Sequence, residues 1–197
     1  PNMRFVAVKS ESQQAVLVMH RMRDQLVHER TALMNQIRSY LHEFGIVIAQ
    51  GRAPLAKIFP IIDEDTQLPL LLRQSIAELA DRLADLERRI QTLDQRISAW
   101  SKQDNAAKAL LTLCGVGPVT ASAAVATAGN VSVFKNGREF AAWLGLVPKQ
   151  NSSGGKSKLG AITKRGDRYL RTLLVQGARV VMIAAQKAKL TQKDNPM

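Results

Sequence analysis

The stretch LRQSIAELADRLADLERRIQTLDQRISAW, residues 72–100, decides the fold class of this chain. Its apolar residues follow alternating steps of four and three: Leu72, Ile76, Leu79, Leu83, Leu86, Ile90, Leu93, Ile97 and Trp100. The spacing repeats over about four heptads, with Glu, Asp and Arg at most other positions, as in a coiled coil. The partner of this helix is either a second helix of the chain, folded back, or the same helix of another protomer. Because an unpartnered seam would face water, we expect a dimer or higher assembly.

A second long helix is expected upstream of the heptads, from Ser10 to Phe44. Its apolar residues recur mostly at steps of three or four: Ala15, Val18, Met22, Leu26, Leu33, Ile37, Tyr40 and Phe44. Ser10 is expected to cap the start of this helix and Gly45 to end it. This helix is the candidate for folding back along the heptads.

The segment between these helices, residues 46–65, contains Gly51, Pro54 and Pro60 and is expected to be an irregular connector. Its last three residues are Asp63-Glu64-Asp65, which we expect to complement the dipole of the following helix rather than to bind a metal. The histidines of the first helix, expected to be solvated or half-buried, also lack a surrounding ligand set. No metal site is therefore assigned to this chain.

The positive charge of the chain belongs to its second half. The formal net charge is +12, and Lys and Arg number 14 against 13 Asp and Glu in residues 1–105, but 14 against 3 in residues 106–197. Such an excess of cations predicts a polyanionic partner. Hydrophobic residues make up 46% of the chain and aromatic residues only 5%, a mix that favours helices. We expect two regions with different tasks.

The sequence shows no sign of export or membrane insertion. Cys114, the single cysteine, lies in an apolar run, so we expect a buried thiol and a reducing, cytoplasmic setting. The first twenty residues do not have the pattern of a signal peptide. Residues 109–134 carry no charge, but Gly115, Gly117 and Pro118 interrupt them. Two helices joined by a tight turn are therefore expected there instead of a membrane span.

Residues 110–121, LLTLCGVGPVTA, have the pattern of a helix-hairpin-helix: a short apolar helix, a Gly-Val-Gly turn and a helix of small residues. Gly115 and Gly117 let the backbone approach a phosphate, and free amides at the start of the second helix attract anions. Pro118 suits the first position of that helix. Such motifs hold the DNA backbone without reading bases. The alternative is an ordinary tight turn between two helices.

The second motif is the loop PKQNSSGGK, residues 148–156, which opens a strongly basic segment. Beside one acid, Asp167, this segment contains seven cations: Lys149, Lys156, Lys158, Lys164, Arg165, Arg168 and Arg171. One interpretation is a flexible loop that binds phosphates. The other is a serine nucleophile on a glycine-rich turn that a phosphodiester approaches closely, with Lys and Arg stabilising the charge of phosphoryl transfer. No carboxylate or histidine within the loop marks a general base.

These motifs resemble those of one family. The segments that carry the resemblance are WLGLVP (143–148), SSGGK (152–156), Gly160, ITKRGD (162–167) and YLR (169–171), with weaker likeness upstream in VAVKS (6–10), residues 30–38 and LHEFG (41–45). The chain is similar to the Piv-type DNA invertases and to the related insertion-sequence transposases with a DEDD acidic tetrad, some of them guided by a bridge RNA. The likeness runs through nearly the whole chain and is most specific in residues 115–171.

The resemblance implies a composite active site. In that family a RuvC-like domain supplies four acidic residues that bind a divalent metal, a coiled coil follows, and a C-terminal transposase domain supplies a serine that bonds covalently to DNA. By that likeness the nucleophile is Ser152 or Ser153. The implied DNA contacts, together with those of the two motifs above, are Gly115, Gly117, Lys149, Lys156, Lys158, Lys164, Arg165, Arg168 and Arg171.

The acidic tetrad matches no residue of this sequence, which opens at Pro1, just beyond where the tetrad should end, and closes at Met197, short of the usual helical end. We therefore expect a truncated chain that has no cofactor of its own, with the divalent metal, Mg²⁺, in the missing domain. Such a chain is expected to bind DNA without recombining it.

The sequence thus predicts a mainly α fold, with a long coiled-coil helical region and a compact basic helical domain that contains the helix-hairpin-helix. The expected domains are a helical remnant at 1–50, a linker and coiled coil at 51–105, and a DNA-binding transposase domain at 106–197, with a short strand or turn at 131–134. The predicted function is that of a fragment of an insertion-sequence transposase or recombinase; the alternative is a non-catalytic architectural DNA-binding module. The expected partners are double-stranded DNA, a structured guide RNA and a second copy of the chain, in the bacterial cytoplasm at the nucleoid.

Overall fold

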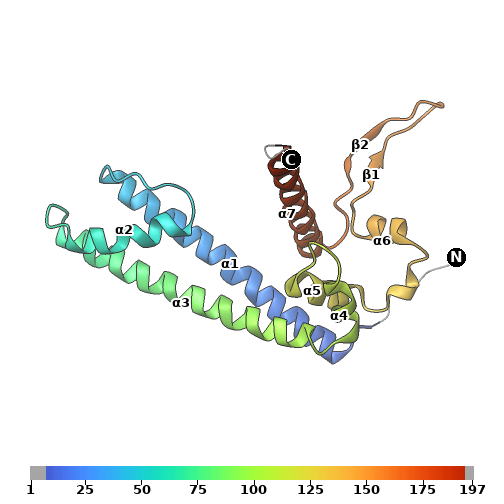
Figure 1. Cartoon of the computed structure of the whole chain (residues 1–197), viewed down its shortest axis with the longest axis horizontal. Helices are drawn as coiled ribbons and strands as arrows, with labels where there is room; N and C mark the ends of the chain where they lie inside the picture. Colours follow the sequence, from blue (N-terminus) through green and yellow to red (C-terminus); the bar gives the residue numbers. More distant parts are fainter. Residues whose placement is uncertain (1–7, 194–197) are drawn as a thin grey trace. The chain divides into compact units, whose positions relative to one another are not determined.

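A computed structural model describes residues 8–193, with side chains up to Ala188 (Figure 1). The fold is mainly helical, as predicted: this range holds seven α-helices, one 3-10 helix and a two-stranded sheet. The chain divides into two compact units. We call residues 19–96 the helical unit, and residues 8–18 together with 97–193 the basic unit.

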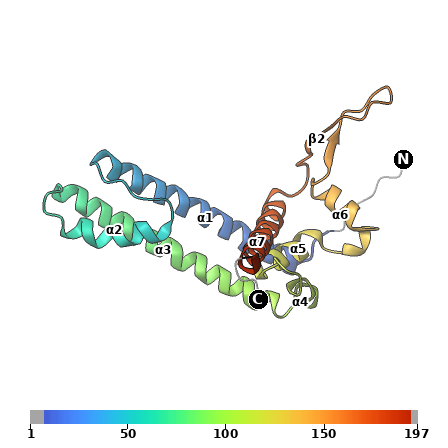
Figure 2. The same ribbon diagram turned by 45° about the horizontal axis from the view of Figure 1, so that its top comes forward.

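Three helices make up the helical unit: α1 (Glu11–Glu43), α2 (Arg52–Glu64) and α3 (Leu70–Ser101), of which α1 and α3 extend into the basic unit. Within the helical unit α1 and α3 lie side by side in both views (Figures 1 and 2). The predicted ends of α1 are confirmed, because the Ser10 hydroxyl accepts a hydrogen bond from the Gln13 amide at 3.2 Å and Gly45 adopts a φ of 78°. The three helices share one core cluster: Leu33, Ile37, Leu41, Leu55, Ile62, Ile76, Leu83 and Leu86.

The heptad seam of α3 is buried within the chain itself. The buried seam residues are Ile76, Leu83, Leu86, Ile90, Leu93 and Ile97. Of the two partners that the sequence leaves open, the structure therefore shows the helix that folds back, α1. An unpartnered seam is the physical reason for expecting an oligomer, and burial of the seam removes that reason. Assembly through these helices stays a prediction.

The predicted apolar stripe of α1 is correct in its middle, at Leu33 and Ile37, but not near its start. Val18 and Met22 are about half exposed, at 50% and 51%, whereas Val16 and His20 are buried. The expectation that the histidines are solvated or half-buried is therefore wrong for His20. A pattern built from apolar residues alone passes over this position, because histidine counts as polar.

His20 is a core residue that the fold keeps neutral. It is 1% exposed, and its charged neighbours Arg23 and Asp94 form an ion pair with each other. Burial lowers the pKa of His20 from 6.5 to about 4; the Arg23 charge also lowers it, and the Asp94 charge opposes both. Neutral imidazole can be buried at far smaller cost than the charged form.

The irregular connector expected over residues 46–65 is wrong, because Arg52–Glu64 forms helix α2. Pro54 lies in the first helical turn, where its missing amide removes no intrahelical bond, and Pro60 is accommodated inside the helix. Burial of Leu55 and Ile62 outweighs the proline penalty. The acidic triplet consequently lies at the end of α2 and not at the start of α3. Asp65 instead caps the turn, accepting a hydrogen bond from the Gln67 amide at 2.9 Å.

The basic unit contains α4 (Asn105–Leu111), α5 (Pro118–Ala128), the 3-10 helix η1 (Val131–Val133), α6 (Gly137–Trp143), β1 (Pro148–Gln150), β2 (Leu159–Ile162) and α7 (Arg168–Lys193). Ala123, Leu144 and Leu170 form its core cluster, joining α5, the end of α6 and α7. The strand or turn expected at 131–134 is a turn of 3-10 helix. None of the helices described is long and apolar enough to cross a membrane.

Two helices joined by a turn, α4 and α5, are found as predicted, but α4 begins at Asn105, ahead of the uncharged run, and ends at Leu111, so residues 112–114 lie in the turn. Gly115 in the turn has a φ of 82°, and a Cβ there would lie 2.9 Å from the carbonyl oxygen of Gly177 in α7. The turn therefore packs backbone against backbone onto α7. Cys114 is predicted to be buried but is exposed. Helix α4 ends at Leu111, so Cys114 lies in the turn and not on the buried side of a helix.

Candidate nucleic-acid interface

The serine-glycine-lysine segment forms a β-hairpin that extends from the rest of the basic unit (Figure 1). β1 and β2 are antiparallel, with Gln150 opposite Leu159, and an isolated bridge places Ser153 opposite Lys156. Gly154 and Gly155, between that last pair, have φ values of 56° and 75°. Two consecutive residues with positive φ are typical of a type I′ turn, which glycine adopts without strain. The glycine turn therefore gives the hairpin a defined strand register.

This register separates the two serines. Residues that pair across a hairpin lie on the same face, and successive residues along a strand alternate between faces. Ser153 therefore shares a face with Lys156 opposite it and with Asn151 two residues earlier, which pairs with Lys158 through a 2.8 Å backbone hydrogen bond. Lys149 lies on the same face. A Cβ built on Gly160 would lie 3.7 Å from the Cβ of Lys149 and 3.8 Å from Nδ2 of Asn151. We call this the lysine face: Lys149, Asn151, Ser153, Lys156 and Lys158.

Ser152 lies on the opposite face of the hairpin. Its neighbours there by register are Gln150 and Leu159, which pair with each other. The Ser152 hydroxyl accepts a hydrogen bond from the Lys158 amide at 3.1 Å, in the position where a strand carbonyl would normally accept. Ser152 thus contributes to hairpin geometry, whereas Ser153 shares by register a face with Lys156 and Lys158.

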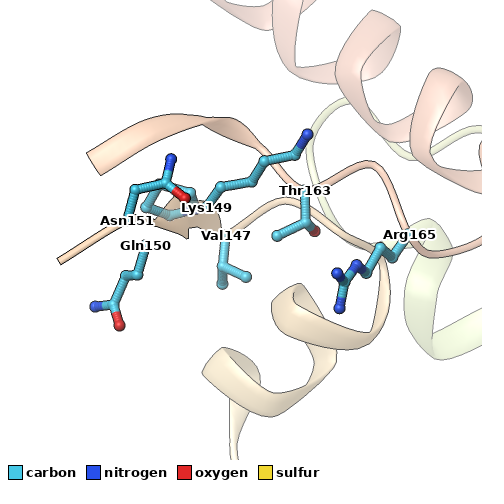
Figure 3. Close-up of a pocket in the computed structure, with 7 residues that line it drawn as sticks. Val147, Lys149, Gln150, Asn151, Thr163 and Arg165 are labelled. Carbon is cyan, nitrogen blue, oxygen red and sulfur yellow. The ribbon is translucent and has the colours of Figure 1, made fainter. Parts of the chain in front are cut away.

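At the base of the hairpin is an open hollow of about 510 Å³. Its lining residues come from both limbs: Val147, Pro148, Lys149, Gln150, Asn151, Thr163 and Arg165 (Figure 3). They provide two cations, two side-chain amides and a hydroxyl, and none of the seven is acidic. The hollow is therefore suited to an anion that also accepts hydrogen bonds.

Arg165 is held in place by unusual backbone packing. A Cβ on Gly145 would lie 2.6 Å from the Arg165 amide nitrogen, and a Cβ on Gly166 would lie 2.1 Å from the carbonyl oxygen of Trp143. Lys164, just before Arg165, has a φ of 57°, a region that lysine rarely adopts. Its amide donates to the Gly145 carbonyl at 3.0 Å. Two glycines and one strained lysine thus fix the segment that carries Arg165.

The remaining cations of the segment differ in their surroundings. Arg168, at the start of α7, is exposed. Arg171 is 9% exposed, and its guanidinium donates to the carbonyl oxygens of Leu144 at 2.9 Å and Gly166 at 3.3 Å. Those bonds tie α7 to the segment before it. Of the seven predicted DNA-contacting cations, Arg171 is therefore the one whose visible contacts are with the protein interior.

The glycines of the α4–α5 turn also differ. A Cβ on Gly115 would clash with α7, as described above, whereas a Cβ on Gly117 would meet nothing within 4 Å. Gly117 immediately precedes Pro118, the first residue of α5, and no side chain caps that helix end. Gly115 is thus needed for packing, while the surroundings of Gly117 are open to a ligand.

Acidic side chains near these cations already have local partners. Asp167 accepts a hydrogen bond from the Leu170 amide at 2.7 Å and caps α7, and Glu139 accepts one from the Lys135 amide at 2.9 Å. Across the described residues no three or more His, Cys, Asp or Glu side chains gather in a way that could hold a metal ion.

Comparison with known proteins shows which proteins this chain resembles. Residues 107–193, from α4 to α7, match the family described as "Transposase IS116/IS110/IS902 family". The chain is 48% identical over 185 residues to the "Probable family 20 transposase" of Pseudomonas aeruginosa, covering 92% of this chain and 55% of that protein. It is 40% identical over 182 residues to the "Transposase for insertion sequence element IS1328" of Yersinia enterocolitica, covering 92% and 54% respectively. The predicted likeness to insertion-sequence transposases is confirmed, and the chain spans about half the length of these relatives.

Sequence reasoning missed the parts of the interface that depend on pairing and packing. Asn151 and Thr163 line the hollow, yet neither is a candidate from the motifs. The pairing itself has a sequence signal, since two glycines between polar residues favour a two-residue hairpin turn. The packing of Gly145 and Gly166 against the Arg165 segment has none, because it joins residues about twenty positions apart.

Proposed function

We propose that the basic unit binds double-stranded DNA and that Ser153 is the nucleophile of a composite active site whose acidic half lies outside these 197 residues. The observation that carries the proposal is the lysine face, on which a serine hydroxyl and three cations occupy one side of a defined hairpin. The match of residues 107–193 to a transposase family supports DNA as the substrate.

In the proposed step, Ser153 Oγ attacks the phosphorus of a DNA phosphodiester. A serine–phosphate ester forms, one P–O bond of the DNA backbone breaks, and the proton of the hydroxyl passes to the leaving deoxyribose oxygen. Lys156, directly opposite Ser153, and Lys158 stabilise the charge that develops on the phosphoryl oxygens. Because Asp167 and Glu139 already accept backbone hydrogen bonds, neither is assigned a part in this proton transfer.

An architectural module that only holds DNA is the second candidate. The open surroundings of Gly117 and the uncapped start of α5 favour phosphate contacts by the α4–α5 hairpin, which need no serine. A structured guide RNA and a second copy of the chain are further partners that the family likeness implies. Titration with structured RNA and light scattering of the purified chain test these two partners.

The first experiment measures binding of duplex DNA to the 197-residue chain by fluorescence anisotropy over a series of salt concentrations. We expect affinity to fall steeply with salt, because each neutralised phosphate releases counterions. Binding that is absent at low ionic strength would contradict a DNA-engaging unit.

The second experiment separates the two candidates. We would join this chain to the remaining length of the Pseudomonas aeruginosa relative and look for a covalent protein–DNA adduct that survives detergent. Ser153→Ala should abolish the adduct without weakening DNA binding, and the matched variant Ser152→Ala should retain it. An adduct lost only in Ser152→Ala would reverse the assignment, and an adduct that persists in both variants would contradict a nucleophile at either serine. Absence of an adduct in all three proteins would favour the architectural module.

A further inference from the structure

The hollow at the base of the hairpin is a second candidate site, distinct from the serine at the tip. Lys149 belongs to both features, because its side chain lines the hollow and also continues the lysine face. Four residues separate Lys149 from Ser153, or about 13 Å along an extended strand at roughly 3.3 Å per residue. A phosphate held at the Lys149 end of the hollow is therefore a different one from the phosphate that Ser153 attacks.

We propose that this hollow binds a non-scissile phosphodiester of the same DNA strand whose scissile phosphate reaches Ser153. The inference rests on the proposed function and assigns a ligand class to a part of the interface that the serine chemistry does not use. Lys149 and Arg165 supply the charge, while Asn151 and Thr163 supply neutral hydrogen-bond donors. A phosphodiester matches both, since it carries one negative charge and accepts hydrogen bonds at its free oxygens.

The packing around Arg165 indicates that the site is preorganised. Gly145 and Gly166 allow the Arg165 segment to approach backbone atoms more closely than any residue with a Cβ would permit. Lys164 is held at a φ of 57°, which is energetically unfavourable for a residue that is not glycine. Such strain persists only where the surrounding fold enforces it, and here the enforced segment presents a cation to the hollow. The backbone that carries Arg165 is therefore ordered before a ligand binds, while the exposed side chain keeps its rotamer freedom until then.

The phosphodiester seat also gives the DNA strand a direction on the protein. With one phosphate held between Lys149 and Arg165 beside Asn151, the strand follows the lysine face to the tip of the hairpin. There Ser153 and Lys156, which pair with each other, meet one and the same phosphate. Phosphate contacts of this kind set register without reading sequence. The hollow would consequently determine which phosphate lies at Ser153.

The test begins with the purified 197-residue chain and dimethyl phosphate, the smallest phosphodiester. We expect NMR shifts at the Arg165 Nε and Asn151 side-chain amide signals, and no such shifts in the double variant Lys149→Gln/Arg165→Gln. Absence of shifts in the unchanged chain, or equal shifts in the double variant, would overturn the phosphate seat even if the chain binds DNA elsewhere.

The second measurement is the salt dependence of duplex binding. We expect the double variant to bind roughly tenfold more weakly and to lower the slope of log affinity against log salt by about one. The control, Arg82→Gln/Arg96→Gln, removes the same charge from two exposed positions of the helical unit and should leave both quantities unchanged. A double variant that matches this control or the unchanged chain would refute the inference. Failure of all the proteins to bind DNA would instead refute the proposed function. Parallel titration with single-stranded RNA shows whether the seat serves DNA in preference to RNA.

Discussion

The helical unit and the basic unit use charged residues in different ways. In the helical unit, arginines pair with carboxylates of the same unit, as in Arg23 with Asp94 and both Arg88 and Arg89 with Asp85. In the basic unit, the carboxylates of Asp104, Glu139 and Asp167 accept hydrogen bonds from backbone amides. Acids that cap helices are not placed to neutralise the hairpin cations. Those cations are therefore available to an external anion, and the function of a charged segment depends on what its acids do as well as on their number.

The largest effect expected from a single substitution is unfolding of the basic unit while the helical unit stays folded. Gly166→Ala would place a Cβ 2.1 Å from the carbonyl oxygen of Trp143 and 2.5 Å from the carbonyl carbon of Leu144. Because backbone atoms cannot move aside as a flexible side chain can, we expect destabilisation of about 3 kcal/mol. Limited proteolysis with mass spectrometry should show cleavage within residues 107–193 and protection of residues 19–96. The control Gly117→Ala should behave like the unchanged chain, since no atom lies within 4 Å of its new Cβ. Equal loss of both units would show that they do not fold separately.

The part of the fold that the sequence predicts well is the part governed by local periodicity. Heptad spacing and the terminal signals at Ser10 and Gly45 are properties of neighbouring residues, and both long helices follow them. Helix α2 is missed because Pro54 and Pro60 are strong local signals against a helix, while burial of Leu55 is a tertiary effect. The sequence likewise could not show which helix covers the heptad seam of α3, because that depends on how the chain folds back.

The candidate site shows the same division between local and tertiary information. The glycine pair that sets the hairpin turn is local, so the separation of Ser152 from Ser153 follows from sequence once strand pairing is assumed. Arg171 belongs to the same basic run as the exposed cations, and only the fold reveals its bonds to Leu144 and Gly166. A run of basic residues therefore predicts the kind of partner but not which member contacts it.

A pH-dependent stability of the helical unit is the next largest expectation. The unfolded chain protonates His20 near pH 6.5, whereas in the fold the pKa of His20 is about 4. Above pH 6.5 His20 is neutral in both the folded and the unfolded chain, and its full contribution to the free energy of unfolding is present. As the pH falls toward 4, only the unfolded chain gains the proton, so the free energy of unfolding decreases. The loss approaches roughly 3 kcal/mol once both states are protonated.

Urea unfolding of the helical unit between pH 7.5 and 4 checks this expectation, with His20→Gln as the test variant and the exposed His28→Gln as its control. The variant His20→Gln should flatten the decline between pH 6.5 and 4, and His28→Gln should preserve it. A decline of equal steepness in all three proteins would assign the acid sensitivity to other groups.

The smallest expected effect tests whether internal pairing in the helical unit matters for its stability or only for its charge balance. The Asp85 carboxylate forms ion pairs with two arginines, with Arg88 Nη2 at 2.9 Å and Arg89 Nε at 2.7 Å. All three side chains are substantially exposed. Since exposed ion pairs contribute little and Arg89 remains after Arg88→Gln, we expect a change below about 0.5 kcal/mol. Asp85→Asn removes both partners and should cost more than Arg88→Gln, though still about 1 kcal/mol or less. Thermal unfolding and DNA titration of the same two variants complete the comparison. If Asp85→Asn releases Arg88 and Arg89 from their carboxylate and duplex affinity rises measurably, the helical unit also contributes cations to DNA, and the division of charge between the units is less strict than the ion pairs indicate.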